Sequence, residues 1–220
     1  NPDIAGHSKR FFKSGPGEYG EGDRFLGIRV PPQRQLARKY RNMSLNEIEE
    51  LLQSPWHEVR LTALFILVQK YEKSDDADRD RIYRFYIDHL DRVNNWDLVD
   101  SSAKKIAGRH LLKRDRSVLY GLARSENLWE RRTAIIATHY FIDHGDFEDT
   151  YRIALILMAD GEDLIHKAAG WMIREAGRHD RSRMEQFLQK NYHEMPRTML
   201  RYAIEHLPER KRQQYLKGTI

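Results

Sequence analysis

An internal repeat constrains the fold of this chain more than any other feature of its sequence. Four stretches align with one another: 56–60 (WHEVR), 96–100 (WDLVD), 128–132 (LWERR) and 163–167 (DLIHK). Their last positions are spaced by 40, 32 and 35 residues. Units of this length that recur along a chain are typical of architectures in which helix pairs stack on one another.

The segments around these stretches have helical periodicity. Leu61, Leu64, Phe65 and Val68 follow the i, i+3, i+4, i+7 template, and no Gly or Pro interrupts 56–71. No alternating β-branched run is bounded by hairpin turns, so a sheet is not expected. We therefore predict an all-α fold, a HEAT-like α-solenoid of stacked antiparallel helix pairs with a concave basic face. An irregular helical bundle with accidental spacing is the alternative.

Local signals mark several helix ends. The stretch 44–47 (SLNE) is typical of a capping box, and Ser54-Pro55 predicts an N-cap followed by Pro at the first helical position. Gly145, Gly161 and Gly177 follow apolar stripes, where C-terminal caps are expected.

The first residues differ in composition from the rest. We expect residues 1–24 to form a short helix near 4–12 and then a loop rich in glycine over 15–22. Residues 25–220 are expected to form the repeat array, and the chain to be a single domain overall.

Charge and composition restrict the partners. The net charge of +5 and pI near 9.3 favour a polyanionic partner. The absence of Cys excludes disulfides and thiolate catalysis and fits a reducing compartment, so we expect a cytoplasmic protein. The most apolar run, 61–68, is far shorter than the roughly 20 residues that span a bilayer, and residues 1–20 do not resemble a signal peptide. No membrane association is expected.

One carboxylate breaks the repeat pattern. The last aligned position is cationic three times (Arg60, Arg132 and Lys167) and acidic once, at Asp100. Trp96 precedes Asp100 by four residues, so the two share a helix face. An aromatic plate and a carboxylate on a basic surface suggest chemistry on a polyanion. Spacing alone favours a plainer interpretation, in which Trp96 is core and Asp100 pairs with Lys104.

Metal and nucleotide motifs are absent from the sequence. The ten His residues are scattered, with no His-Glu-x-x-His motif and no Cys partners. The stretch 15–17 (GPG) lacks the Lys-Ser/Thr of a P-loop and a preceding strand. No metal and no cofactor are expected.

Four ordered boxes resemble a known family. The stretches 25–28 (FLGI), 95–100 (NWDLVD), 125–132 (SENLWERR) and 166–175 (HKAAGWMIRE) resemble the AlkD-type bacterial DNA alkylation-repair glycosylases. The resemblance covers about residues 25–216. It implies a HEAT-like solenoid that holds duplex DNA on a concave basic surface and excises N3- and N7-alkylated purines. We expect such a protein to be a monomer.

The resemblance also implies roles for individual residues. Trp96 and Asp100 match the catalytic pair, and Arg132 and Trp171 match DNA contacts. Further phosphate contacts are expected from the remaining aligned or neighbouring cations, namely Arg60, Lys167 and Arg174. Tyr19 is a loose counterpart of an amino-terminal aromatic residue of the family, because this chain is shorter there. Two alternatives remain: a non-catalytic nucleic-acid-binding HEAT module and a protein-interaction scaffold.

Overall fold

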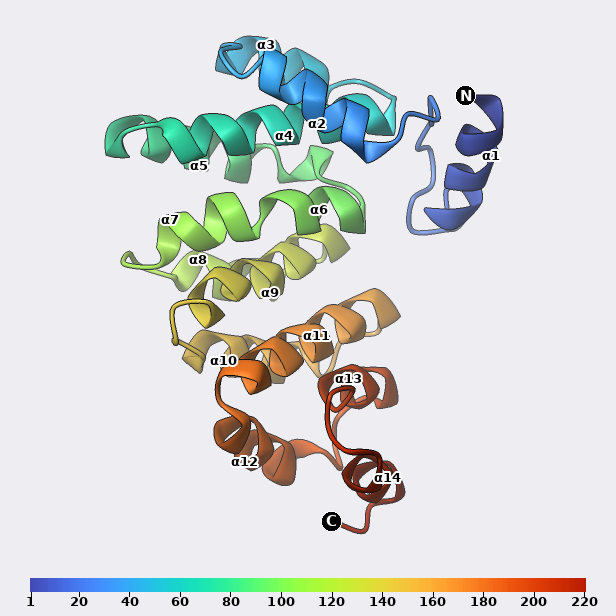
Figure 1. Ribbon diagram of the computed structural model, residues 1–220, viewed down its shortest axis with the longest axis vertical. Helices are drawn as coiled ribbons and strands as arrows, with labels where there is room; N and C mark the ends of the chain where they lie inside the picture. The colour runs from blue at the N-terminus through green and yellow to red at the C-terminus, as the bar shows by residue number, and fades with distance from the viewer. The chain divides into compact units, whose positions relative to one another are not determined.

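The computed structural model describes residues 1–220 and is all-α and solenoid-like, as predicted (Figure 1). No strand is present; an isolated bridge joins Arg24 to Trp56. The chain divides into two compact units, residues 1–110 and 111–220. The predicted boundary near residue 24 and the concave basic face stay predictions.

The first unit is built around one long helix, α4 (His57–Lys73), which packs against α2, α3, α5 and α6. Residues 61–68 are all buried, which explains why this run is apolar apart from Thr62. The other elements of the unit are α1 (Pro2–Phe11), α2 (Val30–Lys39), α3 (Leu45–Leu52), α5 (Asp76–Asp88), a 3₁₀ turn (Leu90–Arg92), α6 (Trp96–Ser102) and a π turn (Lys104–Gly108). The short α7 (Arg109–Leu111) continues the π turn.

The second unit is organised around α11 (Asp163–His179), which packs against α9, α10, α12 and α13. A Cβ at Gly170 would lie 2.4 Å from the carbonyl oxygen of Met199, so the absence of a side chain there allows α13 to approach α11 closely. The other helices are α8 (Ser117–Leu122), α9 (Leu128–Ile142), α10 (Glu148–Leu157), α12 (Arg181–Asn191), α13 (Arg197–Ala203) and α14 (Glu209–Lys217).

The four aligned stretches each lie at the start of a helix. Residues 96, 128 and 163 are the first residues of α6, α9 and α11, and Trp56 is the N-cap of α4. The aligned stretches predicted from the sequence therefore mark, to within one residue, where α4, α6, α9 and α11 begin.

Predictions of helix ends gave mixed results. The capping box over 44–47 is confirmed, because the Ser44 hydroxyl and the Glu47 carboxylate each accept from the other's backbone N–H. Gly145 lies in the left-handed region after α9, with φ 77°.

Three predicted ends are wrong. Gly161 is not a left-handed cap, because α10 ends at Leu157 with Met158 as its C-cap and the φ of Gly161 is not positive. Ser54 is not the N-cap of α4: its hydroxyl accepts from the Trp56 N–H, and the helix begins only at His57. Gly177 lies inside α11, where the helix continues to His179. At Gly177 the missing side chain leaves room for Met184 of α12, since a Cβ there would lie 2.1 Å from its sulfur atom.

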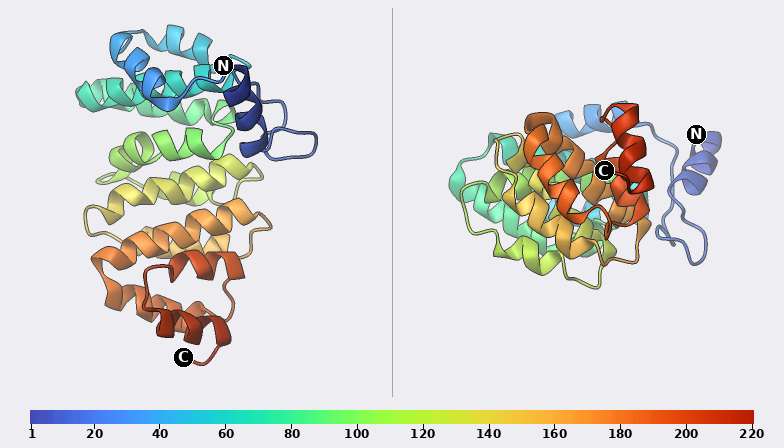
Figure 2. Two further views of the ribbon diagram at one scale, coloured as in Figure 1. Left: turned by 45° about the vertical axis from the view of Figure 1, so that its right-hand side comes forward. Right: turned by 90° about the horizontal axis from the view of Figure 1, so that it is seen from below.

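The amino-terminal helix was expected near residues 4–12 and spans Pro2–Phe11. It lies beside the other helices of the first unit, and the loop after it leads back to them (Figure 2). The amino group of Asn1 donates to the carbonyl of Leu26, 3.0 Å away. No helix in the chain combines the length and the apolar character that a membrane crossing requires.

Candidate functional site

Trp96 and Asp100 lie one turn apart at the start of α6, and both side chains are half-buried. Asn95 fixes where this helix begins: it is fully buried, and its side-chain oxygen accepts from the Trp96 N–H at 2.9 Å. The extended backbone at Asn95 (φ −154°) turns the chain into the helix at Trp96. The helix face that the spacing predicts for Trp96 and Asp100 therefore exists.

A π turn follows directly. The Gly108 N–H donates to the Ala103 carbonyl at 2.9 Å, an i to i+5 bond. Single π turns inside helices are rare, and they occur frequently at functional sites. This turn lies within one to two helical turns of Asp100.

Aromatic residues at the end of the amino-terminal helix pack against the ring of Trp96. The Phe12 ring stacks on Trp96 with centroids 5.2 Å apart, and also on Phe25 at 5.3 Å. The same ring lies 4.8 Å from that of His57. Phe11 meets Trp96 edge-on at 5.7 Å and is 54% exposed. The end of α1 therefore restricts the orientation of Trp96.

A buried network of charges lies behind this cluster. His57 bridges two carboxylates, with Nδ1 2.9 Å from Asp23 and Nε2 2.9 Å from Asp97. Burial alone would lower the pKa of His57, but the hydrogen bonds and charges of both carboxylates outweigh it and raise that pKa to about 9. Burial would raise the pKa of Asp23, yet the hydrogen bond from His57 and the charge of Arg60 hold it below its usual value. His57 is therefore a cation at neutral pH.

Arg60 belongs to this network, and its expected role as a phosphate contact stays a prediction. Its residue surface is 3% exposed, and its guanidinium pairs with Asp23 and donates to the Ser54 carbonyl at 2.9 Å. It also donates to the Asn94 side chain at 3.0 Å. A guanidinium enclosed in this way fixes the loop at residue 23.

Arg132 and Trp171 lie in the second unit. Arg132 is 5% exposed and donates to the Leu164 carbonyl at 2.8 Å, so it holds the start of α11. Trp171 is half-buried, its Nε1–H donates to Glu175 at 3.1 Å, and its ring meets His139 edge-on at 5.7 Å.

The other expected contacts are exposed to different extents. Lys167 pairs with Asp163 at 2.9 Å, with its side chain 39% exposed. Arg174 pairs with Glu205 and contacts Glu175 at 3.5 Å. Tyr19 is half-buried in the loop after α1. Of the expected site residues, the first unit holds Trp96 and Asp100 together, and the second unit holds Trp171 one turn from Lys167.

Sequence reasoning missed the residues that support Trp96. These are Phe11, Phe12, His57, Asp23 and Asp97. The Phe11-Phe12 pair was a visible signal, since two adjacent aromatics at the end of a polar helix need a partner surface. No group of three or more acidic or histidine side chains is arranged to hold a metal ion.

Comparisons with known proteins found a family and a similar fold. Residues 1–207 match the family model described as DNA alkylation repair enzyme. A solved structure described as a predicted DNA alkylation repair enzyme from Enterococcus faecalis superposes with a TM-score of 0.74 at 18% identity, over 95% of this chain and 97% of that one. At this identity the likeness concerns the fold. No functionally curated protein matches the sequence.

Proposed function

The chain belongs to the DNA alkylation repair enzyme family, and from this premise we propose that it is a DNA glycosylase that excises cationic N3- and N7-alkylated purines from duplex DNA. The observation that carries the proposal is the pair Trp96 and Asp100, one turn apart on α6 and supported from behind by a rigid cluster. An aromatic face and a carboxylate are the two groups that a cationic sugar intermediate requires.

The chemistry needs little help at the leaving group. A purine alkylated at N3 or N7 carries a positive charge, so its glycosidic bond is already weak and no acid has to protonate the base. Positive charge then develops on the deoxyribose. A preorganised charge aimed at it contributes about 3–4 kcal/mol. Asp100 takes this role and also orients the water that captures the sugar cation.

Trp96 adds a second stabilising group. The electron-rich face of an indole attracts a desolvated cation by roughly 2 kcal/mol. Such a gain depends on a fixed ring, and Phe12 stacks on Trp96 at 5.2 Å, which limits its rotation.

The proposed DNA contacts are of two kinds. Arg132, Lys167 and Arg174 are assigned to backbone phosphates, since phosphate contacts position a duplex without reading its sequence. For Lys167 and Arg174 this means exchanging Asp163 or Glu205 for phosphate. Trp171 and Tyr19 are assigned to contacts near the lesion.

The test is release of free base. The protein is incubated with a duplex containing N7-methylguanine, and free N7-methylguanine is quantified. Asp100→Asn should lower the single-turnover rate by about 100-fold or more while DNA affinity holds or rises, because a negative charge leaves a surface that faces phosphates. Asp88→Asn, which neutralises an exposed carboxylate on α5, is the matched control and should leave the rate unchanged. Full activity of Asp100→Asn would make the proposed mechanism wrong.

Substrate range gives an independent check. Enzymes that excise neutral bases generally read them in a pocket with hydrogen-bonding groups. Trp96 and Asp100 supply a plate and a charge but no leaving-group acid. Duplexes with uracil, 8-oxoguanine or hypoxanthine should therefore stay intact where N7-methylguanine is released.

A non-catalytic DNA-binding module is the second candidate. It is favoured by the contacts that Phe11 and Phe12 already make with Trp96, because they occupy part of the ring. In that case alkylated duplexes would bind with the salt dependence of a phosphate contact surface, and no free base would be released.

A further inference from the structure

A basic hollow in the first unit is lined by none of the expected site residues. It has a volume of about 380 Å³ and lies between α2, the second half of α4 and the π turn. Its charged lining residues are five cations and one carboxylate: Arg34, Arg38, Arg41, Lys73, Lys105 and Glu72. Arg34 and Arg38 lie four residues apart on one side of α2, and Arg41 lies in the turn after the end of this helix at Lys39.

These cations are almost unpaired. Arg38, Arg41 and Lys73 form no ion pair or hydrogen bond, and Lys105 reaches Glu72 only at 4.0 Å. Several other cations are instead engaged by carboxylates, namely Arg60, Arg116, Arg131, Arg174, Arg183 and Lys211. Crowding unpaired like charges around one hollow is unfavourable unless an anion occupies it.

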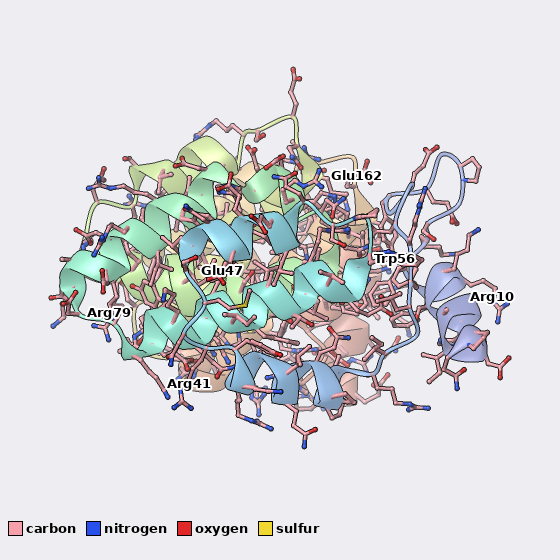
Figure 3. The ribbon with its side chains drawn as sticks, turned by 90° about the horizontal axis from the view of Figure 1, so that it is seen from above. Arg10, Arg41, Glu47, Trp56, Arg79 and Glu162 are labelled. Atoms are coloured by element: carbon pink, nitrogen blue, oxygen red, sulfur yellow. The ribbon has the colours of Figure 1, made fainter.

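Apolar packing holds part of this cluster in place. The Arg34 guanidinium lies over the Phe65 ring, 4.5 Å from its centroid. Stacking on a ring leaves the edge of the guanidinium, with its N–H donors, available to a ligand. Figure 3 shows Arg41 at the end of α2 remote from Trp56. The hollow is therefore separate from the cluster around Trp96.

The helical run 96–111 links the hollow to the candidate catalytic pair. Lys105 follows Asp100 by five residues and Trp96 by nine. At about 1.5 Å per residue, Lys105 lies about 8 Å from Asp100 and about 14 Å from Trp96 along the axis of this run. For a duplex that follows the run, with one phosphate per about 3.4 Å of axis on each strand, these offsets correspond to about two to four base steps.

We infer that this hollow binds the phosphodiester backbone of the DNA duplex, a few base pairs from the alkylated nucleotide. The inference rests on the proposed function, which places the lesion at Trp96 and Asp100. Arginine forks bind phosphate oxygens in pairs, so three of them around one hollow can contact neighbouring phosphates of one strand. The hollow thereby fixes the duplex at a second point and orients the lesion toward α6.

Affinity at several salt concentrations tests the hollow directly. The full chain is titrated with a duplex that carries a central N7-methylguanine. Each phosphate contact contributes about 0.9 to the slope of log affinity against log salt, so the triple variant Arg34→Gln/Arg38→Gln/Arg41→Gln should lower the slope by 2 to 3 and weaken binding at least about tenfold. Single variants give the matched comparison: Arg38→Gln should lower the slope by about 0.9. Arg84→Gln, which removes an exposed and unpaired arginine on α5, should not.

Duplex length tests the position of the contact. Two further duplexes place the lesion one base pair from either end. One of them lacks the backbone that reaches the hollow, so wild-type affinity falls on that duplex and the triple variant loses nothing more there.

Two outcomes would overturn the inference. The first is an unchanged slope, or one changed equally by Arg84→Gln; the second is an equal loss by the triple variant on all three duplexes. Failure of the proposed function has a different signature. It would leave the wild type unable to release N7-methylguanine, while the salt slope still reports whether the hollow binds the DNA backbone.

Discussion

The two central helices, α4 and α11, are equally long but differ in the residues at their starts. Those of α4 are ionic and buried, whereas those of α11 are apolar or lie at the surface. Both span 17 residues, and their starts lie within one residue of the same repeat position. Ionic residues at the start of α4 align with apolar or surface residues at the start of α11: His57 with Leu164, Glu58 with Ile165, and Arg60 with Lys167. His57, Glu58 and Arg60 are all buried, whereas Lys167 is half-exposed and pairs with its own helix.

The difference follows from what each helix start contacts. The start of α4 faces a loop, and the Glu58 carboxylate accepts the backbone N–H groups of Leu26, Gly27 and Ile28. A loop has backbone groups that no ladder satisfies, so its neighbour must offer polar partners. Ile165 is buried on α11, which packs against other helices. The backbone groups of those helices are already paired, so the side chain at this position does not have to offer them a polar partner. The comparison teaches that a repeat position predicts where a residue lies along a helix, and that the neighbour decides its chemistry.

The largest expected effect comes from removing Arg60, in contrast to its aligned counterpart Lys167. Arg60→Ala leaves Asp23 buried beside a vacated guanidinium site, and breaking one side of a buried pair costs about 3–5 kcal/mol of unfolding free energy. Lys167→Ala removes a surface pair within one helix and should cost less than about 0.5 kcal/mol. Urea unfolding followed by circular dichroism measures both. Equal losses would mean that the two helix starts do not differ in energy as they do in burial.

The pH dependence of stability sharpens the same contrast. The folded pKa of His57 is raised to about 9, above its ordinary value of about 6.5. The stability gained from its protonation is therefore fully present below about pH 6.5 and is lost as the pH rises through about 9. A shift of this size corresponds to about 3 kcal/mol.

Unfolding midpoints at pH 6, 7.5 and 9.5 would measure it. His57→Gln should abolish most of the fall, and His206→Gln, at an exposed histidine, should preserve it. Leu164, the counterpart in α11, has no titrating group. A wild-type stability that is flat across this range would contradict a charged His57.

A smaller effect is expected at Glu58. Glu58→Gln replaces one carboxylate oxygen with an NH₂ group that faces the N–H of Leu26 or Gly27, so a charged hydrogen bond becomes a clash of donors. We expect a loss of about 2 kcal/mol in unfolding free energy. Glu50→Gln, an exposed carboxylate on α3, should have no measurable effect. If both variants unfold at the same urea concentration, the loop does not depend on this carboxylate.

The smallest expected stability change concerns the aromatic support of Trp96. Phe12→Ala removes a half-buried ring that contacts Trp96, Phe25 and His57, for a loss of about 1 kcal/mol. The neighbouring Phe11→Ala, at an exposed ring, should change stability very little. If Phe12 orients Trp96, its removal should also slow base excision at saturating DNA. An excision rate that stays at the wild-type value would limit Phe12 to a packing role.

The sequence predicted the helical class and the register of the four aligned stretches, because both depend on local periodicity. It also placed Trp96 and Asp100 on one helix face. The burial of Arg60 was not predictable, since its partner Asp23 lies in a loop without a periodic pattern. The contact of Phe12 with Trp96 joins segments far apart in the chain, and spacing rules describe only near neighbours. Side-chain exposure therefore required the structure.

The π turn has a consequence for the angular phase of the helical run 96–111. An α-helix turns by about 100° per residue, so one extra residue in a turn rotates everything beyond it by about that angle. Upstream, Trp96 takes its phase from the Asn95 cap. Downstream, buried His110 takes its phase from its neighbours, lying 3.3 Å from the Tyr71 hydroxyl and stacked on Tyr83. The π turn accommodates the mismatch between the two ends much as a dislocation accommodates misfit in a crystal. Deleting one residue within 103–108 would relax the run to a plain α-helix and leave both ends facing as they do now.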